Sequence, residues 1–140
     1  MAIVYFDSSA FVKLVVEEDG SELAAALWDG CDAAVASRLA YPEVRAALAA
    51  AGRDHLLDAA DQRRAEAQWE EFWSATRPVE ITQTITMHAG ELASAHALRG
   101  ADAVHLASVL ASRCRRHPAR RLGQSAAHRS RGCWHPRCAR

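Results

Sequence analysis

The stretch of sequence that decides the fold is Ala2-Ile3-Val4-Tyr5-Phe6-Asp7-Ser8-Ser9, which continues directly into Ala10-Phe11-Val12-Lys13-Leu14-Val15-Val16. Its first part, residues 2–6, is apolar, β-branched or aromatic and predicts a short buried strand. Residues 10–16 predict a mostly apolar helix, with Ser8 or Ser9 placed to cap it. Asp7 therefore stands where a buried strand ends and a helix begins.

Asp7 has two interpretations at this position. In open α/β sheets, ligands bind beyond the carboxyl ends of the strands, and a charge placed there needs a partner or a metal ion. An acidic residue in front of a helix is equally typical of a turn or a helix cap. The residue alone does not separate a binding role from a capping role.

The composition indicates one globular domain. The chain has 140 residues, half of them hydrophobic, which is enough to bury a core. No apolar run reaches the ~18 residues of a membrane span. The apolar N-terminus lacks the basic region of a signal peptide and is interrupted by Asp7. We therefore expect a cytoplasmic protein that makes no use of a membrane. Only Cys31 precedes residue 113, which argues against a disulfide framework.

Strands alternate with helices along the first 112 residues. After the strand at 2–6, weaker strands are predicted at 32–36 and 79–82. Helices are predicted at residues 21–28, 38–51, 56–75, 84–98 and 102–110. Pro42 indicates that the helix containing it starts late, because proline is tolerated in a helix only in the first turn. The alternation predicts an α/β fold with a parallel sheet, and the helix over 56–75 fits a long hairpin that extends from it.

Three acidic residues share one context in this pattern. Asp7, Glu43 and Asp102 each lie at or near the start of a helix, against apolar sequence. A cluster of carboxylates at one end of a parallel sheet suits Mg²⁺ or Mn²⁺, and such ions can activate water and stabilise charge on a phosphodiester. Helix-cap acids are common, however, so the spacing alone leaves this interpretation open.

Three segments of the sequence contain these acids in the same order along the chain. The first is Val4-Tyr5-Phe6-Asp7-Ser8-Ser9-Ala10-Phe11-Val12-Lys13-Leu14. The second is Ser37-Arg38-Leu39-Ala40-Tyr41-Pro42-Glu43-Val44-Arg45-Ala46-Ala47-Leu48, and the third is Gly100-Ala101-Asp102-Ala103-Val104-His105-Leu106-Ala107. Together these segments resemble the PIN-domain family, and in particular its VapC-type toxin ribonucleases. The resemblance covers residues 1 to about 110 and implies a PIN-like three-layer fold, with a short parallel sheet flanked by helices.

The resemblance also implies a function. A member of this family is a metal-dependent endoribonuclease that uses Mg²⁺ or Mn²⁺, is usually a homodimer, and is silenced by an antitoxin protein encoded beside it. Asp7, Glu43 and Asp102 carry over as the catalytic and metal-binding acids, and Ser9 matches a small hydroxyl residue near that site. The resemblance gives no catalytic role to His105.

The chain departs from the family beyond residue 110. The family pattern calls for another acid or two and a fourth strand with a Trp-Asp-like pair, yet no Asp or Glu follows Asp102. The charge also changes abruptly: residues 1–112 have a net charge of −9, whereas residues 113–140 contain nine Arg and no acid. We therefore divide the chain into a PIN-like domain at 1–112 and an Arg-, His- and Cys-rich tail at 113–140.

The tail has three interpretations. Its cysteines and histidines could bind zinc, although their spacing is irregular. Its arginines could bind nucleic acid, because Arg pairs well with phosphate. The third, which we favour, is that the tail is translated out of frame, so that the last strand and helix of the domain are lost and the tail is disordered. The candidate zinc ligands are Cys114, His117, Cys133, His135 and Cys138.

The genetic code permits a check of the third interpretation. Leu122-Gly123-Gln124 can be written CTG GGA CAG, which reads Trp-Asp one base later. Residues 125–128, written TCG GCT GCA CAC, then give Ser-Arg-Leu-His. Upstream, the codons of Arg115 and Arg116 permit Asp-Asp. The shifted frame can thus encode the acids and the Trp-Asp pair that the family pattern expects.

Three functions follow as hypotheses from the sequence. The first is a metal-dependent ribonuclease toxin. The second is a catalytically impaired remnant that still binds its antitoxin, and we expect weak or absent cleavage if the tail is out of frame. The third is a non-catalytic RNA-binding protein that uses the basic tail.

Overall fold

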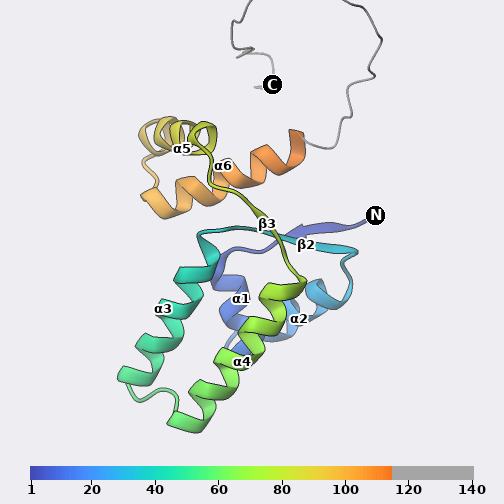
Figure 1. Cartoon of the computed structure of the whole chain (residues 1–140), viewed down its shortest axis with the longest axis vertical. Helices are drawn as coiled ribbons and strands as arrows, with labels where there is room; N and C mark the ends of the chain where they lie inside the picture. The colour runs from blue at the N-terminus through green and yellow to red at the C-terminus, as the bar shows by residue number, and fades with distance from the viewer. Residues whose placement is uncertain (115–140) are drawn as a thin grey trace, which may run out of the picture.

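A computed structural model of the chain describes residues 1–114, in which a three-stranded sheet lies between two layers of helices (Figure 1). All strands are parallel, in the order β1-β2-β3. The strands are β1 (Ile3–Tyr5), β2 (Ala33–Ser37) and β3 (Arg77–Val79). The helices are α1 (Ser8–Val15), α2 (Ser21–Asp29), α3 (Ala40–Arg53), α4 (Ala59–Ala75), α5 (Gln83–His96) and α6 (Gly100–Cys114).

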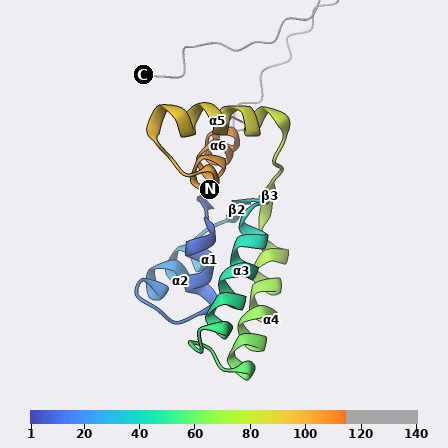
Figure 2. The same ribbon diagram turned by 90° about the vertical axis from the view of Figure 1, so that its left-hand side faces the viewer.

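The two helical layers differ in size. Helices α1 to α4 lie on one side of the sheet, whereas α5 and α6 pack together on the other side (Figures 1 and 2). This arrangement confirms the predicted α/β class, the parallel sheet and the three-layer architecture. Because α1 and α3 follow β1 and β2 directly, their N-termini lie at the carboxyl ends of two adjacent parallel strands.

The residue that caps the N-terminus of α1 is an acid rather than a serine. The side chain of Asp7 caps the helix, since it accepts a hydrogen bond from the backbone N–H of Ala10 at 2.8 Å. The prediction that Ser8 or Ser9 caps the helix is therefore wrong. Both serines lie within the first turn of α1, and the Ser9 hydroxyl donates a hydrogen bond to Asp7 instead.

Strand β3 lies earlier in the sequence than predicted. We expected a strand at 79–82, but the strand is Arg77–Val79, paired with β2 so that Pro78 lies opposite Ala36. Proline is tolerated here because β3 is an edge strand of the described sheet. Thr82 is not available for a strand, because its side chain caps α5 by accepting a hydrogen bond from Ile85.

The predicted helical hairpin is formed by α3 and α4, which extend together away from the sheet (Figure 2). Helix α3 starts at Ala40, so Pro42 falls in its first turn as expected. Helix α4 starts at Ala59 rather than at residue 56, because Asp58 caps it with hydrogen bonds to Ala60 and Asp61.

The apolar core is divided into two clusters. The larger one joins the sheet to the layer of α1 to α4, with Phe6, Phe11 and Trp69 almost fully buried at its centre. Trp28 and Trp73 are partly buried and pack against it. The smaller cluster joins α5 to α6 and includes Ile85, Ala89, Ala103 and Ala107.

The sequence predictions about the tail fall mostly on residues 115–140, outside the described residues. This applies to the out-of-frame interpretation, to the basic arm and to all the candidate zinc ligands except Cys114, at which α6 ends. Within residues 1–114, every helix is too short or too polar to cross a bilayer.

Candidate active site

The three acids predicted from the sequence lie at the N-terminal ends of three different helices. Asp7 precedes α1, Glu43 lies in the first turn of α3, and Asp102 lies in the first turn of α6. The first two follow the carboxyl ends of β1 and β2, where parallel α/β sheets bind their ligands. Helix α6 lies in the other helical layer, and it brings Asp102 and His105 toward this edge of the sheet from the opposite side.

Asp7 is exposed, and its capping role uses only one of its two carboxylate oxygens. Its Oδ1 accepts hydrogen bonds from the Ser9 hydroxyl and from the backbone N–H of Ala10, each at 2.8 Å. Both bonds use the same oxygen, and within residues 1–114 no hydrogen bond is made to Oδ2. The capping and ligand-binding interpretations of Asp7 are therefore compatible, because each can use a different oxygen.

Glu43 is held by a histidine from the opposite helical layer. Its Oε2 lies 2.7 Å from Nε2 of His105, and the side chains of Glu43 and His105 are 28% and 11% exposed. A carboxylate only accepts hydrogen bonds, so we assign a proton to Nε2 of His105. This contact connects the start of α3 to α6.

Tyr5 continues this contact into the sheet. Its hydroxyl lies 2.9 Å from Nδ1 of His105 and accepts a hydrogen bond from the backbone N–H of Ser37 at 3.1 Å. Burial raises the pKa of Tyr5 to about 12, and the charges of Asp7 and Glu43 add to this effect, although the bond from Ser37 opposes it. The phenol therefore keeps its proton at neutral pH.

Asp102 is the least engaged of the three acids. It is exposed, and no hydrogen bond or ion pair involves its side chain within the described part of the chain. It precedes His105 by three residues in α6, so both residues lie on neighbouring positions of one helix face. The structure thus links Glu43 directly to α6, and Asp102 belongs to the same end of that helix.

The donor chemistry suits a hard divalent cation, but the arrangement does not complete a site for one. Carboxylate oxygens are the ligands that Mg²⁺ and Mn²⁺ prefer. Among residues 1–114, however, no group of three or more His, Cys, Asp or Glu side chains could hold a metal ion. The described residues alone therefore do not fit a fully ligated metal.

Sequence reasoning missed two members of this arrangement. His105 was given no catalytic role, and Tyr5 was considered only as part of a buried strand. The spacing of His105 from Asp102 was a usable signal, because residues three apart share a helix face. Nothing in the sequence pairs Tyr5 with His105, since the contact depends on how α6 crosses the sheet.

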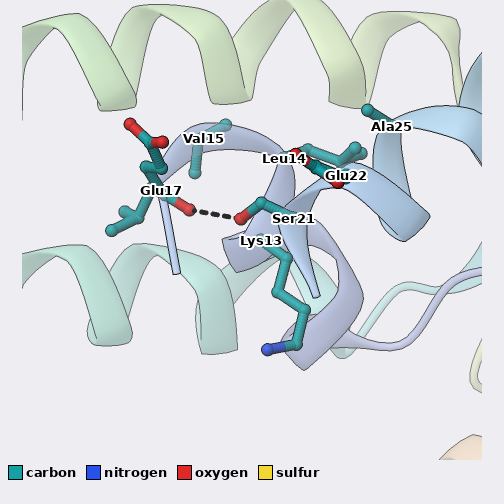
Figure 3. A pocket seen from close by; sticks show the side chains of 8 residues that line it. Lys13, Leu14, Val15, Glu17, Ser21, Glu22 and Ala25 are labelled. Atoms are coloured by element: carbon teal, nitrogen blue, oxygen red, sulfur yellow. Dashed lines mark hydrogen bonds between the residues drawn. The ribbon is translucent and has the colours of Figure 1, made fainter. Parts of the chain in front are cut away.

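A surface groove on α1 lies away from the acids. It is formed where α1 ends and α2 begins, and Ser21 donates a hydrogen bond to the backbone carbonyl of Val16 there (Figure 3). Lys13 lines the groove and pairs with Glu18 at 2.8 Å. None of the three predicted acids lines it, because Asp7 lies at the other end of α1.

The family model of the PIN domain matches residues 4–116. The chain belongs to the PIN domain family. Two mycobacterial proteins are similar to this chain: Ribonuclease VapC45 of Mycobacterium tuberculosis strain CDC 1551 / Oshkosh and Ribonuclease VapC49 of strain ATCC 25618 / H37Rv. Each is 70% identical to this PIN-domain chain over 111 residues, which cover 79% of this chain and 77% of the relative.

A solved structure supports the PIN-like fold. A chain of a toxin-antitoxin complex from Klebsiella pneumoniae superposes with a TM-score of 0.55 at 19% identity, and the match covers 81% of each chain. At this identity, the comparison shows that the two chains share a fold.

Proposed function

We propose that the protein is a metal-dependent endoribonuclease that hydrolyses RNA phosphodiester bonds as the toxin of a type II toxin-antitoxin system. The observation that carries this proposal is the 70% identity to two proteins named as ribonucleases, over 79% of this chain. The position of Asp7 and Glu43 beyond the carboxyl ends of β1 and β2 supports a site at that edge of the sheet.

We assign the reaction to Asp7, Glu43 and Asp102, with Mg²⁺ or Mn²⁺ as the ion. The electrostatics support this assignment, since residues 1–112 have a net charge of −9 and an RNA phosphate approaching three carboxylates is repelled. A divalent cation removes that repulsion and supplies Lewis-acid chemistry when bound. In this scheme Asp7, Glu43 and Asp102 would hold the ion, and the oxygens of Asp7 and Glu43 that accept no hydrogen bond within residues 1–114 would be free to face it.

The test compares Asp7→Asn with the wild type. Asparagine is as good a helix cap as aspartate, so the variant keeps α1 intact while it removes the charge. We expect the wild type to cleave RNA only with Mg²⁺ or Mn²⁺, and the variant to lose cleavage at unchanged stability. Cleavage in the presence of a chelator, or full cleavage by the variant, would contradict the proposal.

The partners follow from the same proposal. A toxin of this kind is cytoplasmic, acts on RNA and is silenced by a cognate antitoxin protein, and we propose a homodimer as its assembly. The solved structure with a similar fold is a chain of a toxin-antitoxin complex, which supports the proposal that this protein binds an antitoxin. Co-expression with the product of the adjacent gene, followed by co-purification and sedimentation, tests both the antitoxin and the dimer.

A second candidate is a toxin whose catalysis is impaired but whose antitoxin binding remains. Two observations favour it: no Asp or Glu follows Asp102 in the sequence, and the described residues lack a group of three metal ligands. We propose that residues 113–140 are translated out of frame, so that the domain loses the acids encoded in the shifted frame. The two mycobacterial relatives also extend beyond the aligned 77% of their own length.

The nucleotide sequence of codons 108–126 tests the frame directly. If those codons, read one base later, encode Asp-Asp and then Trp-Asp, the restored gene should yield a protein that cleaves RNA far faster than this chain. Codons that exclude this run would overturn the frame proposal. A third candidate, RNA binding by the tail, then becomes testable: removal of residues 113–140 should abolish a salt-sensitive RNA affinity.

A further inference from the structure

We propose that His105 is a positioning residue, which fixes the orientation of the Glu43 carboxylate at the site. This inference rests on the proposed function for its catalytic consequence, although the positioning itself is a property of the fold. Catalytic groups act within about 0.5 Å of their productive geometry only when neighbouring side chains lock their rotamers.

The positioning depends on a continuous chain of hydrogen bonds. The backbone N–H of Ser37 in β2 donates to the Tyr5 hydroxyl at 3.1 Å, and that hydroxyl contacts Nδ1 of His105 at 2.9 Å. The other ring nitrogen, Nε2, then donates to Glu43 at 2.7 Å. Each nitrogen of the imidazole has one partner, so rotation of the ring about χ2 would break both contacts.

The first group in this series of hydrogen bonds, Ser37, lies in the buried central strand. Ser37 is fully buried, and its strand pairs with both neighbours in the sheet. Tyr5 is the last residue of β1 and meets the imidazole edge-on, with ring planes at 83°. The backbone of the central strand therefore fixes the orientation of Glu43 through the side chains of Tyr5 and His105.

A purely structural tie explains the observations less well. A tie between α6 and the sheet needs only the contact of Tyr5 with His105, and it gains nothing from a carboxylate whose side chain is 28% exposed. Glu43 instead gives one oxygen to His105, and no hydrogen bond involves Oε1 within residues 1–114. Holding one oxygen and leaving the other open is the arrangement expected of a carboxylate that must face a ligand.

The test compares three substitutions in the full chain. His105→Phe keeps the ring volume but removes both contacts. His105→Gln places an amide N–H where Nε2 was, so it keeps the donor to Glu43. Tyr5→Phe removes the partner of Nδ1 and the acceptor of the Ser37 N–H, but it leaves the contact between His105 and Glu43 in place. The matched control is His96→Phe, which alters an exposed histidine at the end of α5.

Two measurements are made on each variant. The order of the Glu43 side chain is measured by NMR, from the scalar couplings and methylene shift dispersion of ¹³C-labelled glutamate. We expect one rotamer in the wild type and in His105→Gln, rotamer averaging in His105→Phe, and partial averaging in Tyr5→Phe. The second measurement is RNA cleavage, where a misplaced group costs up to about 100-fold in kcat with KM little changed, and His105→Gln should recover most of the loss.

The outcomes separate this inference from the proposed function. Averaging of Glu43 in the wild type, or an ordered Glu43 in His105→Phe, overturns the positioning role whether or not the protein cleaves RNA. Equal loss of kcat in His105→Phe and His105→Gln overturns it as well, because the donor would then be irrelevant. If the wild type cleaves no RNA, the proposed function fails, and the NMR result alone decides the role of His105.

Discussion

The hydroxyl of Tyr5 lies 2.9 Å from Nδ1 of His105, although a hundred residues separate the two in the sequence. The contact joins the first strand to the last described helix, and therefore the sheet to the layer of α5 and α6. Among the described residues the two apolar clusters remain separate, and the contact of Tyr5 with His105 adds a polar link between the sheet and α6. Single substitutions at this link can therefore be tested against substitutions within the clusters.

Alkaline pH should weaken the folded state through Tyr5. Its pKa is about 12 in the folded protein and about 10 when unfolded, so the folded state binds more protons between these values. The free energy of unfolding should therefore fall as pH rises from about 10 towards 12. Guanidinium unfolding followed by tryptophan fluorescence measures this slope, which should be smaller in Tyr5→Phe. An equal slope in the wild type and in Tyr5→Phe would show that folding does not raise the pKa of Tyr5.

Removal of the cap on α1 should destabilise the protein. Asp7→Ala leaves the backbone N–H of Ala10 without its partner, which costs about 0.5–2 kcal/mol of unfolding free energy. Asp7→Asn should cost much less, because asparagine caps equally well. Urea denaturation distinguishes the two variants, and equal losses would mean that the charge of Asp7, rather than its capping bond, stabilises the fold.

Truncation of Trp69 should have the largest effect on stability. The side chain is completely buried at the centre of the larger cluster, in contact with the rings of Phe11 and Trp73. Trp69→Ala should lower the free energy of unfolding by about 3–5 kcal/mol. Trp69→Phe should cost less, since the buried indole Nε1 has no hydrogen-bond partner among residues 1–114 and its removal loses none of the described bonds. A larger loss in the phenylalanine variant would contradict this reasoning.

The end of α5 offers a stabilising substitution. Ala97 adopts a left-handed conformation with φ of 51° where the helix ends. Glycine has no Cβ to strain in this conformation, so Ala97→Gly should raise the melting temperature, with a gain on the order of 1 kcal/mol. The matched control is Ala95→Gly, which should lower the melting temperature because Ala95 lies inside α5. Similar effects of both substitutions would refute the strain at Ala97.

Much of the fold could be predicted from the sequence because its signals are local. The apolar run of β1, the helix periodicities and Pro42 in the first turn of α3 each depend on a few neighbouring residues. The errors arose where two local signals competed. Thr82 has a good strand propensity, yet its hydroxyl caps α5, and Ser8 and Ser9 were considered caps although Asp7 takes that position.

The candidate site could be predicted only in part. Asp7, Glu43 and Asp102 remain a prediction of the sequence that the fold places on three helix N-termini. The roles of Tyr5 and His105 could not be derived, because their contacts depend on the angle at which α6 crosses the sheet. Contacts between residues so far apart leave no periodic pattern in the chain.

The division of the core also governs how the chain folds during synthesis. Every residue of the larger cluster lies before residue 74, and the smaller cluster ends at Ala111. All residues of the larger cluster are therefore synthesised before those of α5, and they can pack together once they have left the ribosome. A change of reading frame after codon 112 would spare every residue of both clusters. Such a product would retain the buried contacts of both clusters, and these contacts would slow its cleavage by cellular proteases.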